Sequence, residues 1–452
     1  MRYRALTLLC LLSMITYIDR VCFGVAGPSI VSALGLRDVS DLKGAFTAFA
    51  IAYSLFEVPS GWLGDRWGAR VTLTRIVLWW STFTIVTGMI GWSWQGMVIG
   101  GAGTLIVIRF LFGAGEAGAY PNITRALHDW FPPHQWPGVQ GMVWMSGRLA
   151  GGLTPLVWMF LVAGPGSILS WRSVFFLFGG IGFVWCLFFW VFFRDRPGEH
   201  AKVNELERHL IRDGREPEHA SDSTLTGDSR EVFFLGELWL LSAIYFLANY
   251  GWYFNITYLP SYLKDHFSAS DTDVWMALYK GGPLWIGAIG CLVGGRLAEI
   301  VGRWSDRPRY WRRILNAIAL AGSGAFWLAA IFATSATMFF LCASAAAFCT
   351  DLTLGSTWAT CQEIGGRFPA VATAVMNTVG TLGAAAAGWG TGWLLEASRE
   401  VSPPPSPSWA QIISLEAGYP SAFLTYFAAY LLASAGWVVL ARLVRDEQEI
   451  WR

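Results

Sequence analysis

The sequence has few charged residues and lacks the common catalytic motifs. Only 14% of its residues are charged, whereas 54% are hydrophobic and the mean hydropathy is +0.44. A soluble protein of this length usually has about a quarter of its residues charged. The chain has no G-x-S-x-G, no H-E-x-x-H and no Gly-Lys phosphate loop, which argues against an enzyme. Its net charge of +1 makes nucleic acid an unexpected partner.

Cysteine pairs and intramembrane histidines are also missing. None of the seven cysteines forms a C-x-x-C pair, and all lie in or near apolar segments, as small buried hydrophobes do. All six histidines fall in loops or at the predicted ends of helices. This placement argues against a metal centre and against a histidine proton relay. We therefore expect no cofactor and no metal.

Long apolar runs recur along the chain, and each can cross a bilayer core of about 30 Å. The predicted spans are residues 5–29, 43–64, 71–91, 96–118, 138–163, 172–193, 236–260, 273–298, 312–332, 335–358, 370–395 and 420–443. The sequence thus predicts an all-α integral membrane protein with twelve transmembrane helices. Most of its 32 lysines and arginines fall on one side if both termini share that side. The positive-inside rule then predicts cytoplasmic termini.

The chain divides into two halves with a repeat. Residues 194–234 hold the only long polar segment and are read as a cytoplasmic linker between an N-terminal bundle, residues 1–193, and a C-terminal bundle, residues 235–452. "GWLGDRWGAR" follows the second span, and the similar "GRLAEIVGR" follows the eighth. Two related six-helix bundles suit a transporter that works by alternating access.

The first of these loops resembles the signature loop of the major facilitator superfamily. Glycines permit a tight turn there, and the Asp65 carboxylate can tether neighbouring helix ends, so that breaking the tether would bias the inward–outward equilibrium. The gating motif expected from this resemblance consists of Gly61, Asp65, Arg66, Gly68 and Arg70. The resemblance implies two pseudo-symmetric bundles.

Other segments are similar to the anion:cation symporter family. They are "YIDRV" in the first span, "IRFLFGAGEAGAYPNITRALHDWFP" around the fourth, and "WATCQEIGGRF" and "MNTVGTLGA" near the tenth and eleventh. Bacterial members carry hexuronates, hexonates, aldarates and similar carboxylates, usually with protons. The resemblance therefore implies a proton-coupled importer of a sugar acid in the inner membrane. We expect it to act as a monomer. Glu57 stands where many members have glutamine.

The fourth span carries ionisable residues on one predicted helix face. Arg109, Gly113, Glu116 and Tyr120 are spaced by three or four residues. A charge near the centre of a bilayer costs at least about 2.5–3.5 kcal/mol, so this face is not expected to meet lipid. Arg109 and Glu116 lie about 10 Å apart along a helix, so each is expected to have other partners.

Asp19 and Arg20 are adjacent in the first span and point about 100° apart on a helix. Arg20 is assigned to a central cavity, because a guanidinium offers a bidentate fork to a substrate carboxylate. Asp19 and Glu116 become the candidate proton carriers. The resemblance gives the same roles to these positions, with Arg109 coupling protonation to the site.

Six further residues are candidates for the site: Arg148, Tyr53, Glu57, Asp351, Asn377 and Tyr17. Arg148 either lines the cavity, where it would suit dicarboxylates, or forms a structural ion pair with Glu57 or Asp19. Tyr53, which shares a helix face with Glu57, is a substrate contact or a packing residue. Asp351 pairs with an arginine or touches substrate. By resemblance, Asn377 bonds the hydroxyls of a sugar acid, and Tyr17 is a weaker cavity candidate.

Three classes of function remain in competition. The leading one is a proton-coupled importer of small organic anions. The second is an exchanger of phosphorylated anions for phosphate with the same fold, which the arginines alone do not exclude but Asp19 and Glu116 disfavour. The third is a non-transporting membrane sensor or an integral membrane enzyme, against which stand the absent catalytic motifs and the absence of an appended soluble domain.

Overall fold

The computed structural model describes residues 1–37, 39–94, 97–98, 100–163, 168–213, 228–267, 274–401, 408–414 and 417–443. Helices dominate, and the two short strands, β1 (Ser93–Trp94) and β2 (Met97–Val98), pair antiparallel. The first half contains α1 (Arg2–Val25), α2 (Gly27–Leu34), η1 (Val39–Leu42), α3 (Lys43–Trp67), α4 (Ala69–Met89), α5 (Ala102–Glu116), α6 (Ala119–Trp130), η2 (Pro133–Gln135), α7 (Trp136–Trp158), the π-turn η3 (Met159–Ala163) and α8 (Trp171–Phe192).

The central linker contributes η4 (Pro197–Glu199), α9 (Glu205–Asp213) and η5 (Ser229–Phe234), and its residues 214–227 lie outside the described part. The second half contains α10 (Gly236–Trp252), α11 (Phe254–Thr257), α12 (Leu259–Phe267), α13 (Val274–Trp304), α14 (Pro308–Ala330), α15 (Ala336–Leu352), α16 (Leu354–Gly365), α17 (Pro369–Val401), α18 (Trp409–Ile413) and α19 (Tyr419–Arg442).

The chain forms two compact units. The first comprises Met1–Pro133, Ser146–Phe234 and Gln362–Thr378, and the second comprises His134–Met145, Leu235–Cys361 and Val379–Arg452. Each unit therefore takes one short segment from the other half of the sequence. The first turns of α17 thereby belong to the same unit as α1, α3 and α5.

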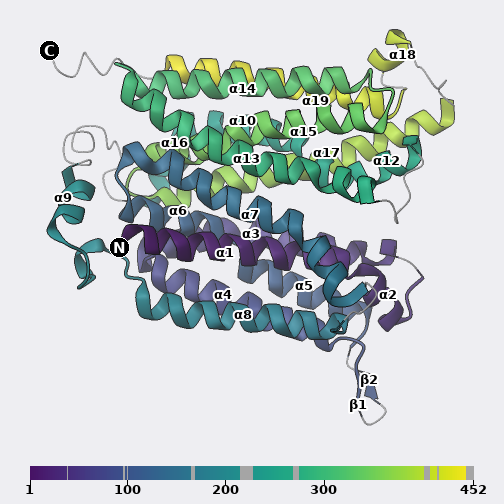
Figure 1. The fold of residues 1–452 in the computed structure, drawn as a ribbon, viewed down its shortest axis with the longest axis horizontal. Helices are drawn as coiled ribbons and strands as arrows, with labels where there is room; N and C mark the ends of the chain where they lie inside the picture. The colour runs from purple at the N-terminus through teal and green to yellow at the C-terminus, as the bar shows by residue number, and fades with distance from the viewer. Residues whose placement is uncertain are drawn as a thin grey trace. The chain divides into compact units, whose positions relative to one another are not determined.

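Within the first unit, α3 packs on α5, α4 packs on α8 and α5, and α1 packs on α8 and α6 (Figure 1). Its buried core includes Phe23, Ile30, Leu105 and Val174. Within the second unit, α14 packs on α19 and α15, and α13 packs on α15. Phe254 lies at the centre of an aromatic cluster there, with ring centroids 5.1 Å from Trp327 and 5.3 Å from Phe423.

The predicted helical spans are present, with one clear correction. Nine helical segments of the described chain are long and apolar enough to cross a membrane, and the remaining three predicted spans correspond to α3, α4 and α10. The predicted fourth span at residues 96–118 was misplaced, because β2 and a turn precede α5 and the helical segment runs from Ala102 to Trp130.

A break at Gly118 divides this fourth segment into α5 and α6. Gly118 has φ +83°, a left-handed conformation that glycine adopts at no steric cost. A Cβ here would lie 2.4 Å from the side chain of Ser60, so the break also brings α6 against α3. Tyr120 therefore follows the break and belongs to α6, so the helix from Arg109 to Tyr120 is not continuous, but Glu116 and Tyr120 both contact α1, through Arg20 and Ser13.

Candidate functional site

The central feature of the first unit is an ion pair between α1 and α5. Arg20 Nε donates to Glu116 Oε1 at 2.5 Å. The Glu116 side chain is only 1% exposed, whereas that of Arg20 is 25% exposed. The Arg20 side chain is therefore partly accessible, while its carboxylate partner is enclosed. The Arg20 guanidinium also lies over the ring of Tyr53, with Cζ 4.6 Å from the centroid.

Asp19 points away from this pair, as its place beside Arg20 on a helix requires. It is buried, and neither carboxylate oxygen accepts a hydrogen bond from the described residues. Arg109 and Glu116 are its charged neighbours, and the Trp80 indole is a further polar neighbour. The structure thus brings both predicted proton carriers into one electrostatic cluster.

Arg109 lies among aromatic rings. Its Cζ is 4.1 Å from the ring centroid of Phe23, 4.4 Å from that of Phe112 and 5.0 Å from that of Phe49. Such cation–π contacts stabilise a guanidinium away from water. The residue is only 3% exposed, and Glu116 and Asp19 are its oppositely charged neighbours. The expectation that Arg109 and Glu116 have different partners is confirmed.

Glu57 is fully buried and connects α3 to α17. Its Oε1 accepts a hydrogen bond from Asn377 Nδ2 at 2.5 Å, and its Oε2 accepts one from Thr378 Oγ1 at 3.2 Å. Tyr53 lies one turn earlier on α3, beneath the Arg20 guanidinium. Asn377, the predicted hydroxyl ligand, is therefore held by a carboxylate of the protein in this conformation.

Arg148 approaches the α1 face that carries Arg20. Its Nη1 donates to the Tyr17 hydroxyl at 2.7 Å, and Tyr17 lies one turn before Arg20. Two glycines of α7 allow this close approach, since a Cβ on Gly147 or Gly151 would lie 2.6 or 2.9 Å from the Tyr17 ring. The structure does not show the alternative ion pair of Arg148 with Glu57 or Asp19. Glu57 binds α17 instead, and the Asp19 oxygens accept no hydrogen bond from the described residues.

Asp351 belongs to the second unit. It is fully buried on α15 and faces α13, where a Cβ added to Gly287 would lie 2.1 Å from Asp351 Oδ2. The Tyr430 hydroxyl is an electrostatic neighbour. These contacts place Asp351 in the packing between α13 and α15 of that unit.

The gating motif forms a tether at the end of α3. Asp65 accepts hydrogen bonds from the backbone N–H groups of Val371, at 2.9 Å, and Ala370, at 3.3 Å, in the first turn of α17. A carboxylate is favoured at a helix N-terminus, where N–H groups lack intrahelical acceptors. Arg125 Nη1 donates both to Asp65, at 3.2 Å, and to the Arg367 carbonyl, at 2.9 Å. Gly61 allows α17 to approach, since a Cβ there would lie 2.7 Å from the Ala370 carbonyl oxygen.

The rest of the motif fixes the turn between α3 and α4. Gly68 has φ +86°, and a Cβ there would lie 2.6 Å from the carboxylate of Asp195. Asp195 accepts a hydrogen bond from the Arg70 backbone N–H at 2.8 Å and so caps α4. The Arg70 guanidinium donates to the Trp190 carbonyl at the end of α8, while Arg66 lies over the Trp62 ring.

The second copy of the motif makes the corresponding contacts inside the second unit. A Cβ on Gly295 would lie 2.7 Å from the Pro137 carbonyl oxygen in the first turn of α7, as Gly61 does with Ala370. The Glu299 carboxylate lies against Gly138, where a Cβ would be 1.9 Å from Oε1. Both copies of the motif therefore place a carboxylate beside the start of a long helix.

Sequence reasoning missed four residues that complete these sites: Trp80, Arg125, Asp195 and Thr378. Each contacts a predicted site residue from another helix or from a loop far along the chain. No local pattern identifies such partners. Within the described residues, no group of three or more His, Cys, Asp or Glu side chains is arranged to hold a metal ion.

The comparisons with known proteins agree with this architecture. The family model of the Major Facilitator Superfamily matches residues 9–388. A probable sulfoacetate transporter from Cupriavidus necator is 32% identical over 380 residues, which are 83% of each chain. A hexuronate transporter from Bacillus subtilis is 29% identical over 358 residues, which are 78% of each chain. The solved structure of a proton:xylose symporter has the same fold, with a TM-score of 0.71 at 14% identity, covering 100% of this chain and 99% of that one.

Proposed function

The chain belongs to the major facilitator superfamily, in its anion:cation symporter-type branch, and we propose that it is a proton-coupled symporter importing a small organic anion. The family is one of membrane transporters and not of enzymes. The protein acts in the bacterial inner membrane with both termini in the cytoplasm, the orientation that the positive-inside rule favours.

The ion pair between Arg20 and Glu116 carries this proposal. A guanidinium that is one-quarter exposed can receive a carboxylate or sulfonate, but Glu116 already occupies part of its donor set. An anion must therefore compete with Glu116. Protonation of Glu116 removes the competing charge and releases Arg20 for the substrate, so that proton and anion bind together.

The energetics of the cycle follow from charge. The carrier crosses between conformations either with both substrate and protons or with neither, because crossing with only one of them would uncouple the substrate from the proton gradient. If Asp19 and Glu116 each take a proton for one monoanion, each cycle moves a net charge of +1. A membrane potential then adds about 2.3 kcal/mol per 100 mV to the driving force.

The substrate is a small mono- or dianion. Arg148 reaches the Tyr17 hydroxyl on the α1 face that also carries Arg20, so two cations lie along one side of this helix. A second acidic group on the substrate would bind there. Sugar acids would add hydroxyl contacts to Asn377, which Glu57 must first release. Sulfoacetate and hexuronates, the substrates of the two relatives, both fit the requirement for an anionic head group.

Gating is assigned to the Asp65 tether. Its hydrogen bonds to Ala370 and Val371, with Arg125 beside them, join the ends of α3 and α17 in this conformation. We expect the tether to break when the carrier changes its access, with alternating access arising from relative motion of the N-terminal and C-terminal bundles, residues 1–193 and 235–452.

Uptake by the purified protein in proteoliposomes tests this function. Uptake of radiolabelled hexuronate, hexonate, aldarate and sulfoacetate should be measured under three conditions. These are an inside-alkaline pH gradient, the same gradient with a protonophore, and internal phosphate in place of the gradient. Gradient-driven accumulation that the protonophore abolishes is expected for at least one of these anions. Uptake that requires internal phosphate and ignores the pH gradient would instead indicate exchange with phosphate.

A further inference from the structure

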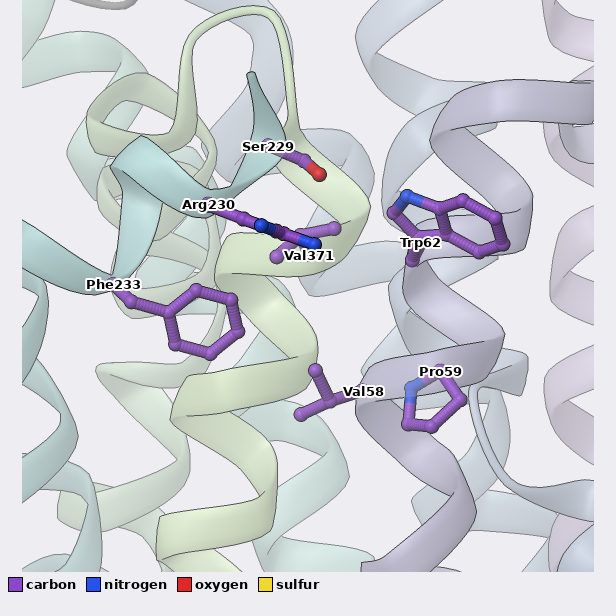
Figure 2. A pocket seen from close by; sticks show the side chains of 7 residues that line it. All are labelled: Val58, Pro59, Trp62, Ser229, Arg230, Phe233 and Val371. Carbon is purple, nitrogen blue, oxygen red and sulfur yellow. The ribbon is translucent and has the colours of Figure 1, made fainter.

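A surface groove of the first unit lies beside the α3–α17 tether. It is lined by three segments and has a volume of about 220 Å³. Its lining residues are Val58, Pro59 and Trp62 of α3, Ser229, Arg230 and Phe233 of η5, and Val371 of α17 (Figure 2). The groove is separate from the ion pairs of the candidate site.

The wall of the groove is mostly apolar, but Arg230 brings one guanidinium group to it, and a second, that of Arg66, lies over the ring of the lining residue Trp62. Figure 2 shows the Arg230 side chain extending from η5 into the space between Val371 and Trp62. Among the described residues, no acceptor or carboxylate binds this guanidinium, and only its backbone N–H is engaged, by Asp228. The Arg66 guanidinium lies over the ring of the lining residue Trp62, with Cζ 5.1 Å from its centroid, and Arg66 is exposed.

The apolar part of the groove continues along a face of α3 that is suited to lipid. Leu55 is 62% exposed, Phe56 39% and Trp62 40%, and Phe233 on η5 is 38% exposed. Apolar side chains so exposed on a transmembrane helix meet acyl chains, and tryptophan is enriched at the depth of the head groups. An occupant must therefore present an anion to Arg230 and Arg66 and hydrocarbon to α3.

We propose that this groove binds an anionic glycerophospholipid, with its phosphate between Arg230 and Arg66 and an acyl chain along Val58, Pro59 and Phe233. Basic pockets beside transmembrane helices recognise acidic head groups by this chemistry. A zwitterionic lipid is disfavoured because its ammonium group meets two guanidinium groups. The proposal does not depend on the identity of the transported anion or on proton coupling.

Binding here also stabilises the tether. The Val371 side chain lines the groove while its backbone N–H donates to Asp65. A lipid that contacts α3, η5 and α17 together therefore adds contacts between the elements that Asp65 joins. Anionic lipid should accordingly favour the conformation described here.

Native mass spectrometry of the full-length protein released from nanodiscs tests the proposal. Discs containing equal amounts of phosphatidylglycerol and phosphatidylcholine should yield protein that retains phosphatidylglycerol preferentially. Arg230→Gln and Arg66→Gln should each reduce this retention about fivefold, the factor equivalent to about 1 kcal/mol per cation near an anionic membrane surface. Arg230→Lys should retain most of it, and Phe233→Ala should weaken retention without changing charge.

Arg303→Gln is the matched control, because Arg303 is also an exposed arginine at the end of a long helix, α13, but belongs to the second unit. It should retain phosphatidylglycerol like the parent. Equal losses in Arg303→Gln and Arg230→Gln would overturn the proposal in favour of diffuse surface attraction. Displacement of the lipid by soluble glycerol 3-phosphate would overturn it in favour of a soluble phosphate site. If Arg230→Gln fails to fold, Arg66→Gln and Phe233→Ala test the proposal instead. Unchanged retention of phosphatidylglycerol in both variants would refute the site.

Discussion

Replacing Glu116 with glutamine tests the coupling step directly. Glutamine has nearly the same shape as a protonated glutamate and cannot ionise, so Glu116→Gln fixes the site in the charge state proposed for the loaded carrier. In the parent protein, Glu116 Oε1 binds Arg20 Nε at 2.5 Å, and an incoming anion competes with it. The variant should therefore bind substrate more tightly than the parent in alkaline buffer, where the parent retains the ion pair.

The size of the effect follows from the exposure of the pair. A fully exposed ion pair contributes about 0–1 kcal/mol, whereas removing one partner of a buried pair costs about 3–5 kcal/mol. With Glu116 enclosed and Arg20 one-quarter exposed, the pair falls between these limits. Release of Arg20 from this competition should contribute about 1.4 kcal/mol to substrate binding, which is about tenfold in Kd. In acidic buffer, where the parent is protonated, the difference should disappear.

Calorimetry in detergent at one acidic and one alkaline pH measures the binding change, and paired transport assays measure its consequence. Parent affinity should fall as pH rises, because binding takes up protons, while the affinity of Glu116→Gln should depend less on pH, because only Asp19 remains to take up a proton. In proteoliposomes the variant should exchange substrate in counterflow but should not accumulate it under a proton gradient. Asp19→Asn is the companion variant, expected to lose gradient-driven accumulation as well. Full accumulation in both variants would refute proton symport, and a parallel pH dependence in Glu116→Gln and parent would refute the competition between Glu116 and substrate.

Three further predictions follow from the contacts of this unit. Arg20→Lys should weaken substrate binding although charge is retained, because the bidentate fork is lost, and Arg20→Ala should abolish binding in calorimetry; normal affinity in a folded Arg20→Ala would exclude Arg20 as the anion ligand. Arg148→Gln should reduce uptake of dianions more than uptake of monoanions, whereas an equal reduction with a lower Tm would indicate a structural role. Glu57→Ala should lower the unfolding free energy by about 1–3 kcal/mol, since it removes two hydrogen bonds made by the fully buried Glu57 carboxylate, and Glu57→Gln should lose less. Thermal unfolding in one detergent compares the two Glu57 variants, and an alanine variant as stable as the parent would show that this contact between α3 and α17 contributes nothing.

Hydrophobic patterning predicted the helices well because a bilayer leaves the backbone few alternatives. Within lipid, N–H and C=O groups must be satisfied inside the segment, so a long apolar run becomes a helix almost regardless of its details. The interruptions were harder to predict. The break at Gly118 depends on the approach of Ser60 from α3, a contact between residues far apart in the sequence. A glycine within an apolar run does not show by itself whether the helix continues.

The site was predictable to the extent that charge is expensive in a membrane. That cost, together with the family resemblance, indicated Asp19, Arg20, Arg109 and Glu116 as candidates. Helical spacing also predicted that Arg109 and Glu116 do not pair with each other, but it did not predict which residues each of them contacts. The aromatic rings around Arg109 come from three separate positions on α1, α3 and α5, and Asn377 reaches Glu57 from the other half of the chain. Such pairs depend on how helices pack, which the sequence pattern of one helix does not encode.

The two predicted proton carriers differ in what protonation would change. A proton on Asp19 breaks no hydrogen bond to the described residues, since neither of its oxygens accepts one. A proton on Glu116 removes the charge that holds Arg20 and so alters the anion site itself. Arg109 interacts electrostatically with both carboxylates, and the two carboxylates also interact with each other. We therefore expect Glu116 to be the carboxylate that links the proton to the substrate, and Asp19 to set the charge of the cluster in which this exchange would take place.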